Sequence, residues 1–397
     1  MRESKNHNQR IGIVLSQAPG YSETFFRSKI TGLIDAGNQV VLFSSENAQN
    51  FDLCPVILLP KTHKNILKQL LGLICVYLGL LPHLKPVIRY VRLERKDNIG
   101  WVTILKRLYT HGPVFKQNLD WLHFGFGTLA LGCENLAAAN QAKLAVSFRG
   151  FDIGVYPIKH PNCYARLWDK VSKIHVISDD ISDLVYKHGF KDQAPIIKIT
   201  PAIDTHYFST LKQSAFESPI QMVTVARLHW KKGLDYTLEA LALLKQAGIS
   251  FEYRIIGEGP EEEALKFACY QLGIEDEVFF LGKLNHADVK QQLEKSQVYI
   301  QFSVQEGFCN AVLEAQSMGL LCVVSDAEGL AENILDGHTG WVIPKRSPQL
   351  LAQKIKSVIS LSEKQNQEIR VCAMSRIKEQ FNIEKQQKEF IQFYNEY

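Results

Sequence analysis

The sequence has no cysteine motif. Its eight cysteines lie at positions 54, 75, 133, 163, 269, 309, 322 and 372, with no C-x-x-C pair, and most lie in apolar runs. A zinc site or a disulfide framework needs closely spaced pairs. We therefore expect reduced cysteines that pack mainly in the core.

Long apolar runs are also missing. The most apolar stretch, "LLGLICVYLGLLP" (70–82), has 13 residues, and a membrane-spanning helix needs about 20. Basic residues follow it closely: Lys85, Arg89, Arg92, Arg95 and Lys96. Two interpretations remain open: an interfacial helix that docks on anionic lipid, or a core helix followed by a solvated basic helix.

The N-terminal "MRESKNHNQR" is polar and runs directly into the strand-like "IGIVLS". An apolar leader is absent from this stretch. We expect a cytoplasmic protein that can be peripheral at the cytoplasmic membrane face.

No Asp-x-Asp motif occurs anywhere in the sequence. Such a motif would supply carboxylates for a metal-bridged diphosphate. The acidic cluster "SDDISD" (178–183) is more typical of a helix start. We therefore expect neither a metal nor a cofactor.

Charge is unevenly distributed. Residues 1–200 carry 25 Lys+Arg against 15 Asp+Glu, and residues 201–397 carry 20 against 26. The segment 61–116 holds 11 basic residues and only Glu94 and Asp97 as acids. This concentration favours an anionic surface or an acidic ligand. Nucleic acid is a poor candidate, because the segment has no aromatic stacking platform or known module.

Short apolar runs alternate with helical patterns in both halves of the chain, which is typical of parallel α/β sheets. The expected strands are 11–16, 39–44, 121–124, 144–148, 173–178 and 196–200, then 221–226, 251–257, 278–282, 298–303, 321–325 and 340–344. Residues 209–219 have no strand or helix periodicity, which is typical of a linker. We predict two doubly wound domains, 1–205 and 206–380, and a C-terminal helix, 381–397, that packs back on the first domain.

Cations follow the strand 221–226. Arg227 comes directly after it, followed by Lys231, Lys232 and Gly233. A planar guanidinium, a movable ammonium and a helix start can together clamp a diphosphate. A solvated basic turn is the alternative.

Two glycines, Gly257 and Gly259, follow the next strand in "IIGEGPEEEAL". Glycines at this position permit a tight turn or the close approach of a ligand. The G-x-G-P pattern alone does not distinguish the two.

The stretch "SVQEGFCNAVLEAQSMG" (303–319) predicts a loop with Glu306 and Gly307, then a helix that begins near Phe308 to Asn310. Backbone N–H groups at a helix start bind hydroxyl or phosphate oxygens. Carboxylates accept hydrogen bonds from vicinal hydroxyls. Glu306 therefore suits a hexose and Glu314 a ribose, although Glu314 could instead cap a neighbouring loop.

Together with "VARLHWKKGLD", "VFFLGKL" and "SDAEGLAENILDGHTGWVIP", these motifs make residues 221–344 resemble the group 1 retaining glycosyltransferases, which use nucleotide sugars and have the GT-B architecture. The resemblance implies two Rossmann-like domains that face each other across a cleft. It also implies that Arg227 and Lys232 hold the donor diphosphate, Glu306 orients the transferred sugar and Glu314 binds the ribose. Gly307, Phe308, Cys309 and Asn310 would line the donor site.

The first half is similar to exopolysaccharide transferases of the colanic-acid and amylovoran type. The likeness rests on "PGYSETFFRSKITGLIDAGNQVVLFS", "LDWLHFGFG" and "VSFRGFDIGVYP". It implies a cleft bordered by Ser22, Glu23, Thr24, His123 and Asp152.

Arg149 stands where many relatives carry histidine. Arginine stays protonated and cannot act as a general base. Arg149 could bind the donor phosphate or an anionic acceptor, or its presence could mark altered or lost catalysis.

The resemblance implies a retaining hexosyltransferase. Its acceptor would be a glycan or a polyprenyl-linked oligosaccharide, in exopolysaccharide or lipopolysaccharide biosynthesis. A sugar-nucleotide-binding scaffold without turnover, at the membrane, is an alternative of another class. A GT-B epimerase or phosphorylase is a third.

Overall fold

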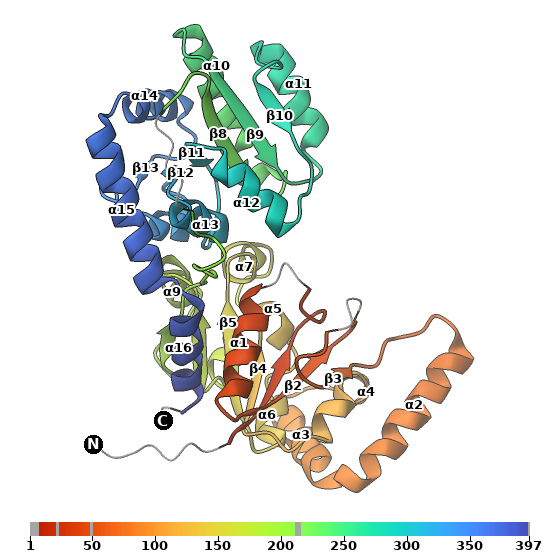
Figure 1. Cartoon of the computed structure of the whole chain (residues 1–397). Helices are drawn as coiled ribbons and strands as arrows, with labels where there is room; N and C mark the ends of the chain where they lie inside the picture. Colours follow the sequence, from red (N-terminus) through yellow and green to blue (C-terminus); the bar gives the residue numbers. More distant parts are fainter. Residues whose placement is uncertain (1–7, 21–23, 48–50, 211–215, 396–397) are drawn as a thin grey trace, which may run out of the picture. The chain divides into compact units, whose positions relative to one another are not determined.

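The computed structural model describes residues 8–20, 24–47, 51–210 and 216–395. The chain divides into two compact α/β units (Figure 1). Unit 1 comprises Met1–Ile199 and Gln386–Tyr397, and unit 2 comprises Thr200–Lys385. The division thus falls six residues before the domain end expected from the sequence.

Unit 1 is built on a seven-stranded parallel sheet with the order β3-β2-β1-β4-β5-β6-β7. Its strands are β1 (Arg10–Val14), β2 (Gln39–Ser44), β3 (Val56–Leu58), β4 (Trp121–Phe124), β5 (Lys143–Phe148), β6 (Lys173–Val176) and β7 (Ile196–Lys198). The six strands predicted for this half are all present. Only β3 was missed, because three residues between Pro55 and Pro60 are too short for a periodic pattern.

Nine α-helices are described in unit 1 before residue 200. They are α1 (Thr24–Asp35), α2 (Ile66–Leu80), α3 (Leu84–Lys96), α4 (Trp101–Phe115), α5 (Gly127–Ala130), α6 (Leu136–Ala139), α7 (Tyr156–Lys159), α8 (Ala165–Trp168) and α9 (Asp179–Lys187). The core between sheet and helices includes the fully buried Ile11, Ile13, Leu42 and Ala145.

The last helix, α16 (Ile383–Asn395), completes unit 1 from Gln386 onward. Phe390, Phe393 and Tyr394 are buried and share one face of this helix, because they are three and four residues apart. Phe390 packs edge-on against Phe25, with 5.5 Å between ring centroids. Lys173 Nζ donates a hydrogen bond of 2.5 Å to the Phe393 carbonyl.

Unit 2 repeats the arrangement with six parallel strands in the order β10-β9-β8-β11-β12-β13. They are β8 (Ile220–Val225), β9 (Phe251–Ile256), β10 (Val278–Phe280), β11 (Val298–Gln301), β12 (Leu321–Ser325) and β13 (Trp341–Ile343). The helices are α10 (Leu234–Gln246), α11 (Glu262–Leu272), α12 (His286–Glu294), α13 (Asn310–Ser317), α14 (Pro348–Ile359) and α15 (Glu363–Gln380). The predicted doubly wound α/β class is confirmed.

In each sheet the strand order reverses once, between β1 and β4 in unit 1 and between β8 and β11 in unit 2. Open α/β sheets bind ligands at such switch points, beyond the carboxyl ends of the strands. Arg227 follows β8 and Glu306 follows β11. The fold of unit 2 therefore brings these two predicted residues to the same edge of the sheet.

The cysteines of the chain are all free thiols. Five are buried, at positions 54, 133, 269, 309 and 322, whereas Cys75 and Cys372 are exposed. The expectation that the cysteines lie mainly in the core is confirmed.

One helical stretch of the described chain, Ile66–Lys96, is long and apolar enough to cross a membrane by length and composition alone. It comprises α2, a short turn and α3. Only 6% of its most apolar window is buried, and in α2 only Leu80 is buried. The interpretation of this apolar run as a core helix is therefore wrong.

Truncation of Phe390 tests the role of α16. Phe390→Ala should lower the free energy of unfolding of unit 1 by about 3–5 kcal/mol, because it removes a fully buried ring. Gln392→Ala, on the exposed side of the same helix, is the control. Urea denaturation of both variants measures the effect; equal stability would mean that α16 contributes no packing energy.

Candidate functional site

Lys232 and Glu306 form an ion pair that joins the loop after β8 to the loop after β11. Backbone contacts hold the loops together, since Val304 N–H and Gln305 N–H donate to the Lys231 carbonyl at 2.8 and 3.2 Å. Gly233 has φ +59, and a Cβ there would lie 2.2 Å from the Phe302 carbonyl oxygen. This close approach requires glycine.

The pair is largely shielded from water. The side chains of Lys232 and Glu306 are 13% and 15% exposed. Burial opposes the charged ammonium, but attraction to Glu306 outweighs it and raises the pKa of Lys232 above its usual value. Burial lowers the pKa of the neighbouring Lys231.

Arg227 lies beside these residues on the exposed surface. Its guanidinium is close enough to oppose the charging of Lys231 and Lys232. Three cations against the Glu306 carboxylate leave a formal charge of 3 − 1 = +2 at this edge of the sheet. The arrangement can therefore attract a ligand with two negative charges, such as a diphosphate.

Glu328 positions the Glu306 loop. Its Oε2 accepts a hydrogen bond of 2.9 Å from the Glu306 backbone N–H. Its Oε1 lies 3.4 Å from Lys345 Nζ. Glu328 adopts φ +35, a left-handed value that is uncommon outside glycine. The sequence did not indicate a role for Glu328, because no spacing rule links it to Glu306.

Asn333 fixes the next part of the same loop. It accepts from Cys309 N–H at 3.2 Å and donates to the Cys309 carbonyl at 2.9 Å. Arg376 donates to the Asn333 carbonyl at 2.6 Å. Both polar ends of the Asn333 side chain are therefore engaged, and the loop has a defined backbone path into α13.

Helix α13 begins at Asn310, as predicted. Phe308 and Cys309, just before it, are buried, and Phe308 packs against Phe381 with 5.8 Å between ring centroids. Burial raises the pKa of Cys309 to about 12, so its thiol stays protonated and is no nucleophile at neutral pH. The backbone N–H and carbonyl of Cys309 are bound by Asn333, so Cys309 has a structural role at the start of α13.

Glu314 lies on α13, and burial raises its pKa to about 7. Its ordinary value is 4.5. No hydrogen bond or ion pair joins its carboxylate to another of the residues that the structure describes. A shielded carboxylate without a partner is costly, and a ligand with hydroxyl groups would satisfy it.

Gly257 and Gly259 have a packing role in unit 2. A Cβ on Gly257 would lie 1.8 Å from the Ala226 carbonyl oxygen, and one on Gly259 would lie 2.2 Å from that of Leu228. Leu228 N–H also donates to the Glu258 carbonyl at 3.0 Å. The glycines thus bring the loop after β9 against the loop that carries Arg227.

Arg149 follows β5 in unit 1 and stacks on aromatic rings. Its guanidinium carbon lies 3.6 Å from the ring centroid of Phe25 and 4.5 Å from that of Phe26. Such cation–π stacking holds the charge in a semi-buried position. The residue is therefore a fixed cation at the carboxyl edge of the unit 1 sheet.

Asp152 organises the same loop. Its Oδ1 accepts from the backbone N–H groups of Arg149 and Gly150 at 3.0 and 2.9 Å. Its Oδ2 accepts from Gly127 N–H at 3.0 Å. Burial nevertheless raises the pKa of this carboxyl above its usual value. With its oxygens engaged by backbone, Asp152 positions the Arg149 loop.

The expected place of His123 at an acceptor cleft is wrong. His123 lies within β4 and is fully buried. Its Nδ1 lies 3.1 Å from Lys29 Nζ and 2.6 Å from Tyr394 Oη, and its Nε2 lies 2.8 Å from Ser147 Oγ. Lys29 is also buried, and burial lowers its pKa well below the usual value. These residues form a polar core beneath α16 that the sequence did not indicate.

Ser22 and Glu23 lie outside the described residues, so their expected place at a cleft stays a prediction. Thr24 is the first residue of α1.

The chain was compared with protein families and known proteins. The family profile described as glycosyl transferases group 1 matches residues 209–370. The putative colanic acid biosynthesis glycosyltransferase WcaL of Escherichia coli is 26% identical over 402 aligned residues, 94% of this chain and 96% of that protein. The amylovoran biosynthesis glycosyltransferase AmsK of Erwinia amylovora is 31% identical over 278 residues, 68% of this chain and 67% of that protein.

Among solved structures, HepE of Anabaena in complex with UDP-glucose superposes with a TM-score of 0.72. That match has 16% sequence identity and covers 97% of this chain and 99% of the other. Two parallel Rossmann-like sheets and this likeness define the GT-B architecture of glycosyltransferases. On the relatives named above, the chain belongs to the group 1 glycosyltransferases.

The carboxyl of Glu314 predicts a pH-dependent stability. Its folded pKa of about 7 exceeds its ordinary 4.5, so the folded state holds a proton that the unfolded state releases, and stability is lost as pH rises through this window. Glu314→Gln should therefore be more stable than wild type near pH 8, on the order of 1 kcal/mol, and equal to it near pH 4.

Thermal unfolding of both proteins across this range measures the difference. Glu239→Gln, at an exposed position of α10, is the control and should show no pH-dependent difference. A Glu314→Gln effect that is constant with pH would contradict the raised pKa.

Proposed function

We propose that the protein transfers a hexose from a nucleoside-diphosphate sugar to a hydroxyl of a glycan or lipid-linked oligosaccharide, with retention of anomeric configuration. The observation that carries this proposal is the Lys232–Glu306 ion pair at the switch point of the unit 2 sheet. Parallel sheets bind nucleotides at this position, and a cation beside a carboxylate suits a ligand with both phosphate and hydroxyl groups.

Each part of the donor would bind a different polar group of unit 2. Arg227 and Lys232 bind the diphosphate, and Glu306 turns from Lys232 to the hydroxyls of the sugar. The first-turn N–H groups of α13, which have no partner within the helix, add donors to phosphate or sugar oxygens. Glu314 accepts from the ribose hydroxyls, which offsets the cost of its burial.

The named activities of the relatives support a role in surface polysaccharide synthesis. Relatives that align with most of the chain are named for colanic acid and amylovoran biosynthesis. We infer an exopolysaccharide or lipopolysaccharide acceptor, with the transfer on the cytoplasmic side of the membrane.

For the reaction itself we favour attack from the face of the leaving group. The bond between the anomeric carbon and the diphosphate oxygen breaks as the acceptor oxygen bonds to the same carbon, and the acceptor proton passes to the departing phosphate oxygen. Lys232 and Arg227 stabilise the charge on that phosphate. A covalent route is not favoured by the described residues beside the ion pair, since Cys309 is protonated and Glu306 is assigned to the donor.

Arg149 cannot take the acceptor proton as a base. Its stacked guanidinium suits a phosphate of the donor or of an anionic acceptor. The same residue favours a second candidate function, a scaffold that binds sugar nucleotides without turnover. Transfer or donor hydrolysis by the purified protein distinguishes the two.

A panel of nucleotide sugars screened by thermal shift would identify the donor, because a ligand that binds the folded state raises its melting temperature. The anomeric configuration of the product, read by NMR, tests retention. An inverted product would overturn the same-face mechanism.

Substitutions at the ion pair test the donor site. Lys232→Met and Glu306→Gln should each lower kcat/KM for transfer at least about tenfold, or about 1.4 kcal/mol of transition-state stabilisation. Lys266→Met removes an exposed lysine from α11 and should leave the rate unchanged. Circular dichroism confirms that each variant is folded; near-wild-type rates in both pair variants would refute the assignment.

We also propose that transfer needs no divalent metal, because cationic side chains take its place. The described residues contain no group of three or more potential metal-ligating His, Cys, Asp or Glu side chains. Dialysis against EDTA should therefore leave the initial rate within about twofold of the untreated enzyme. A loss that Mg²⁺ or Mn²⁺ restores would overturn this point.

A further inference from the structure

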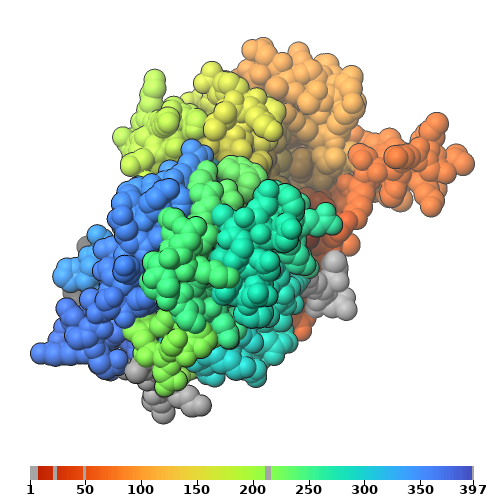
Figure 2. Space-filling view, turned by 90° about the horizontal axis from the view of Figure 1, so that it is seen from above, coloured from red at the N-terminus to blue at the C-terminus, as the bar shows by residue number. Residues whose placement is uncertain are grey.

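Exposed apolar side chains are concentrated on one part of unit 1. Of 24 exposed large hydrophobic residues in the described chain, 12 lie between positions 66 and 105. They are Ile66, Leu67, Leu70, Leu71, Ile74, Leu78, Leu81, Leu84, Ile88, Trp101, Val102 and Leu105. Figure 1 shows α2 standing away from the sheet of unit 1, and Figure 2 shows orange residues of this region projecting from the surface.

Helix α2 is held in place along one face. A Cβ on Gly72 would lie 2.9 Å from Tyr109 Oη, and one on Gly112 would lie 2.7 Å from Val76 Cγ1, so α2 and α4 approach closely. Tyr77 Oη donates to the Leu105 carbonyl at 2.8 Å. The helix is therefore a packed element with a defined orientation.

The other face of α2 carries apolar residues without cover. Leu67, Leu71, Ile74 and Leu78 are three or four residues apart and so form one stripe. Each is between 47% and 75% exposed. Contiguous exposed apolar surface of this kind marks a binding surface for protein or membrane.

Basic residues form a second stripe on α3, the next helix along the chain. Lys85, Arg89, Arg92 and Lys96 follow one another at intervals of four, three and four residues and thus share one face. Lys85, Arg92 and Lys96 are exposed and Arg89 is partly exposed.

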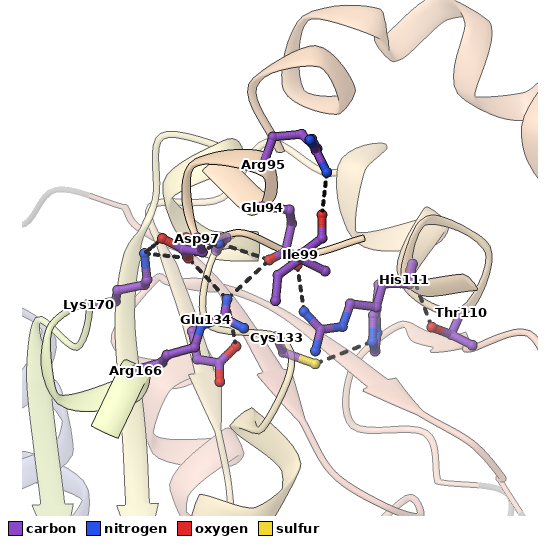
Figure 3. A network of polar contacts seen from close by, with 12 residues as sticks. Glu94, Arg95, Asp97, Ile99, Thr110, His111, Cys133, Glu134, Arg166 and Lys170 are labelled. Carbon is purple, nitrogen blue, oxygen red and sulfur yellow. Dashed lines mark hydrogen bonds and ion pairs between the residues drawn. The ribbon is translucent and has the colours of Figure 1, made fainter. Parts of the chain in front are cut away.

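Glu94 and Asp97, the two acidic residues of the segment 61–116, do not neutralise the basic stripe of α3. Their carboxylates form ion pairs with basic residues of unit 1 (Figure 3). Glu94 is fully buried and pairs with Arg107 at 2.5 Å. Asp97 pairs with Lys170 at 2.9 Å and with Arg166 at 3.0 Å. Both carboxylates are therefore paired, and the ion pairs attach the end of α3 to the rest of unit 1.

The stretch Ile66–Lys96 is long enough to cross a membrane, but α2, its apolar part, ends at Leu80 and the basic helix α3 begins at Leu84. Fifteen residues give a helix of about 22 Å, and the hydrocarbon core is about 30 Å thick. Directly after α2 come Pro82 and the basic stripe of α3, which begins at Lys85. The apolar stripe is therefore suited to lie in the interface of a bilayer, with α3 at the level of the headgroups.

We propose that the exposed face of α2, together with the basic stripe of α3, docks on the surface of a lipid bilayer that contains anionic lipid. The apolar stripe of α2 enters the boundary between headgroups and acyl chains. The cations of α3 bind the anionic headgroups, which explains why the acids of this segment are turned inward. The proposal does not depend on the donor or the reaction, because lipid binding is measured without either.

Flotation of the full-length protein with vesicles tests the docking surface. The protein should float with vesicles of phosphatidylcholine and phosphatidylglycerol, and much less with phosphatidylcholine alone. The double variant Leu71→Glu, Leu78→Glu should bind at least about tenfold more weakly, because charged residues would have to enter the interface. Its matched control is Phe267→Glu, Tyr270→Glu on α11 of unit 2, where both rings are similarly exposed.

The basic stripe is tested separately. Arg92→Gln, Lys96→Gln should weaken binding to the anionic vesicles and reduce its dependence on salt. The milder Leu71→Ser, Leu78→Ser replaces the glutamate variant if that variant is unfolded by circular dichroism.

Three results would overturn the proposal. The first is no flotation with either vesicle, and the second is equal flotation with neutral and anionic vesicles. The third is a dimer, measured by light scattering, that Leu71→Glu, Leu78→Glu dissociates while vesicles are not bound. That outcome would assign the stripe to an interface between copies of this chain.

Discussion

The ion pair between Lys232 and Glu306 is the interaction on which the site of unit 2 depends. It joins two loops that leave neighbouring strands at the point where the strand order reverses. Gly233 lets the loops touch, while Glu328 and Asn333 hold the backbone on the far side. A charged pair so little exposed is costly unless further groups support it. The surrounding hydrogen bonds supply that support and keep both charges beside a position where a ligand can bind.

In unit 1, buried polar and charged groups join secondary-structure elements to one another, whereas in unit 2 the ion pair lies at the candidate donor site. Lys29, His123 and Tyr394 form a polar core that joins the sheet to α16, and Glu94 joins α3 to the body of the unit. Buried groups of this kind need complete hydrogen bonding, so they restrict the positions of the elements that carry them. The Arg149 guanidinium in addition stacks on the rings of Phe25 and Phe26, beside the carboxyl edge of the sheet. The exposed charges of α3 include Lys85, Arg92 and Lys96, and α3 follows the apolar helix α2 along the chain.

Twelve of the strands could be predicted because buried parallel strands are continuous apolar runs, whereas β3 is only three residues long. Lys232 and Glu306 were found because both follow such strands. Glu328 and Asn333 were missed because their bonds join loops 22 and 24 residues apart without a motif. His123 was misplaced because the residue that covers it, Tyr394, is 271 positions away. The exposure of α2 was undecided because an apolar run alone does not show which of its faces has a partner.

The central claim is that the charges beyond β8 and β11 bind the donor. A crystal structure with a bound nucleoside-diphosphate sugar tests it most directly. The account predicts diphosphate oxygens within hydrogen-bond distance of Arg227 and Lys232, sugar hydroxyls on Glu306 and ribose hydroxyls on Glu314. A donor bound elsewhere, with the Lys232–Glu306 pair intact and unchanged, would contradict it.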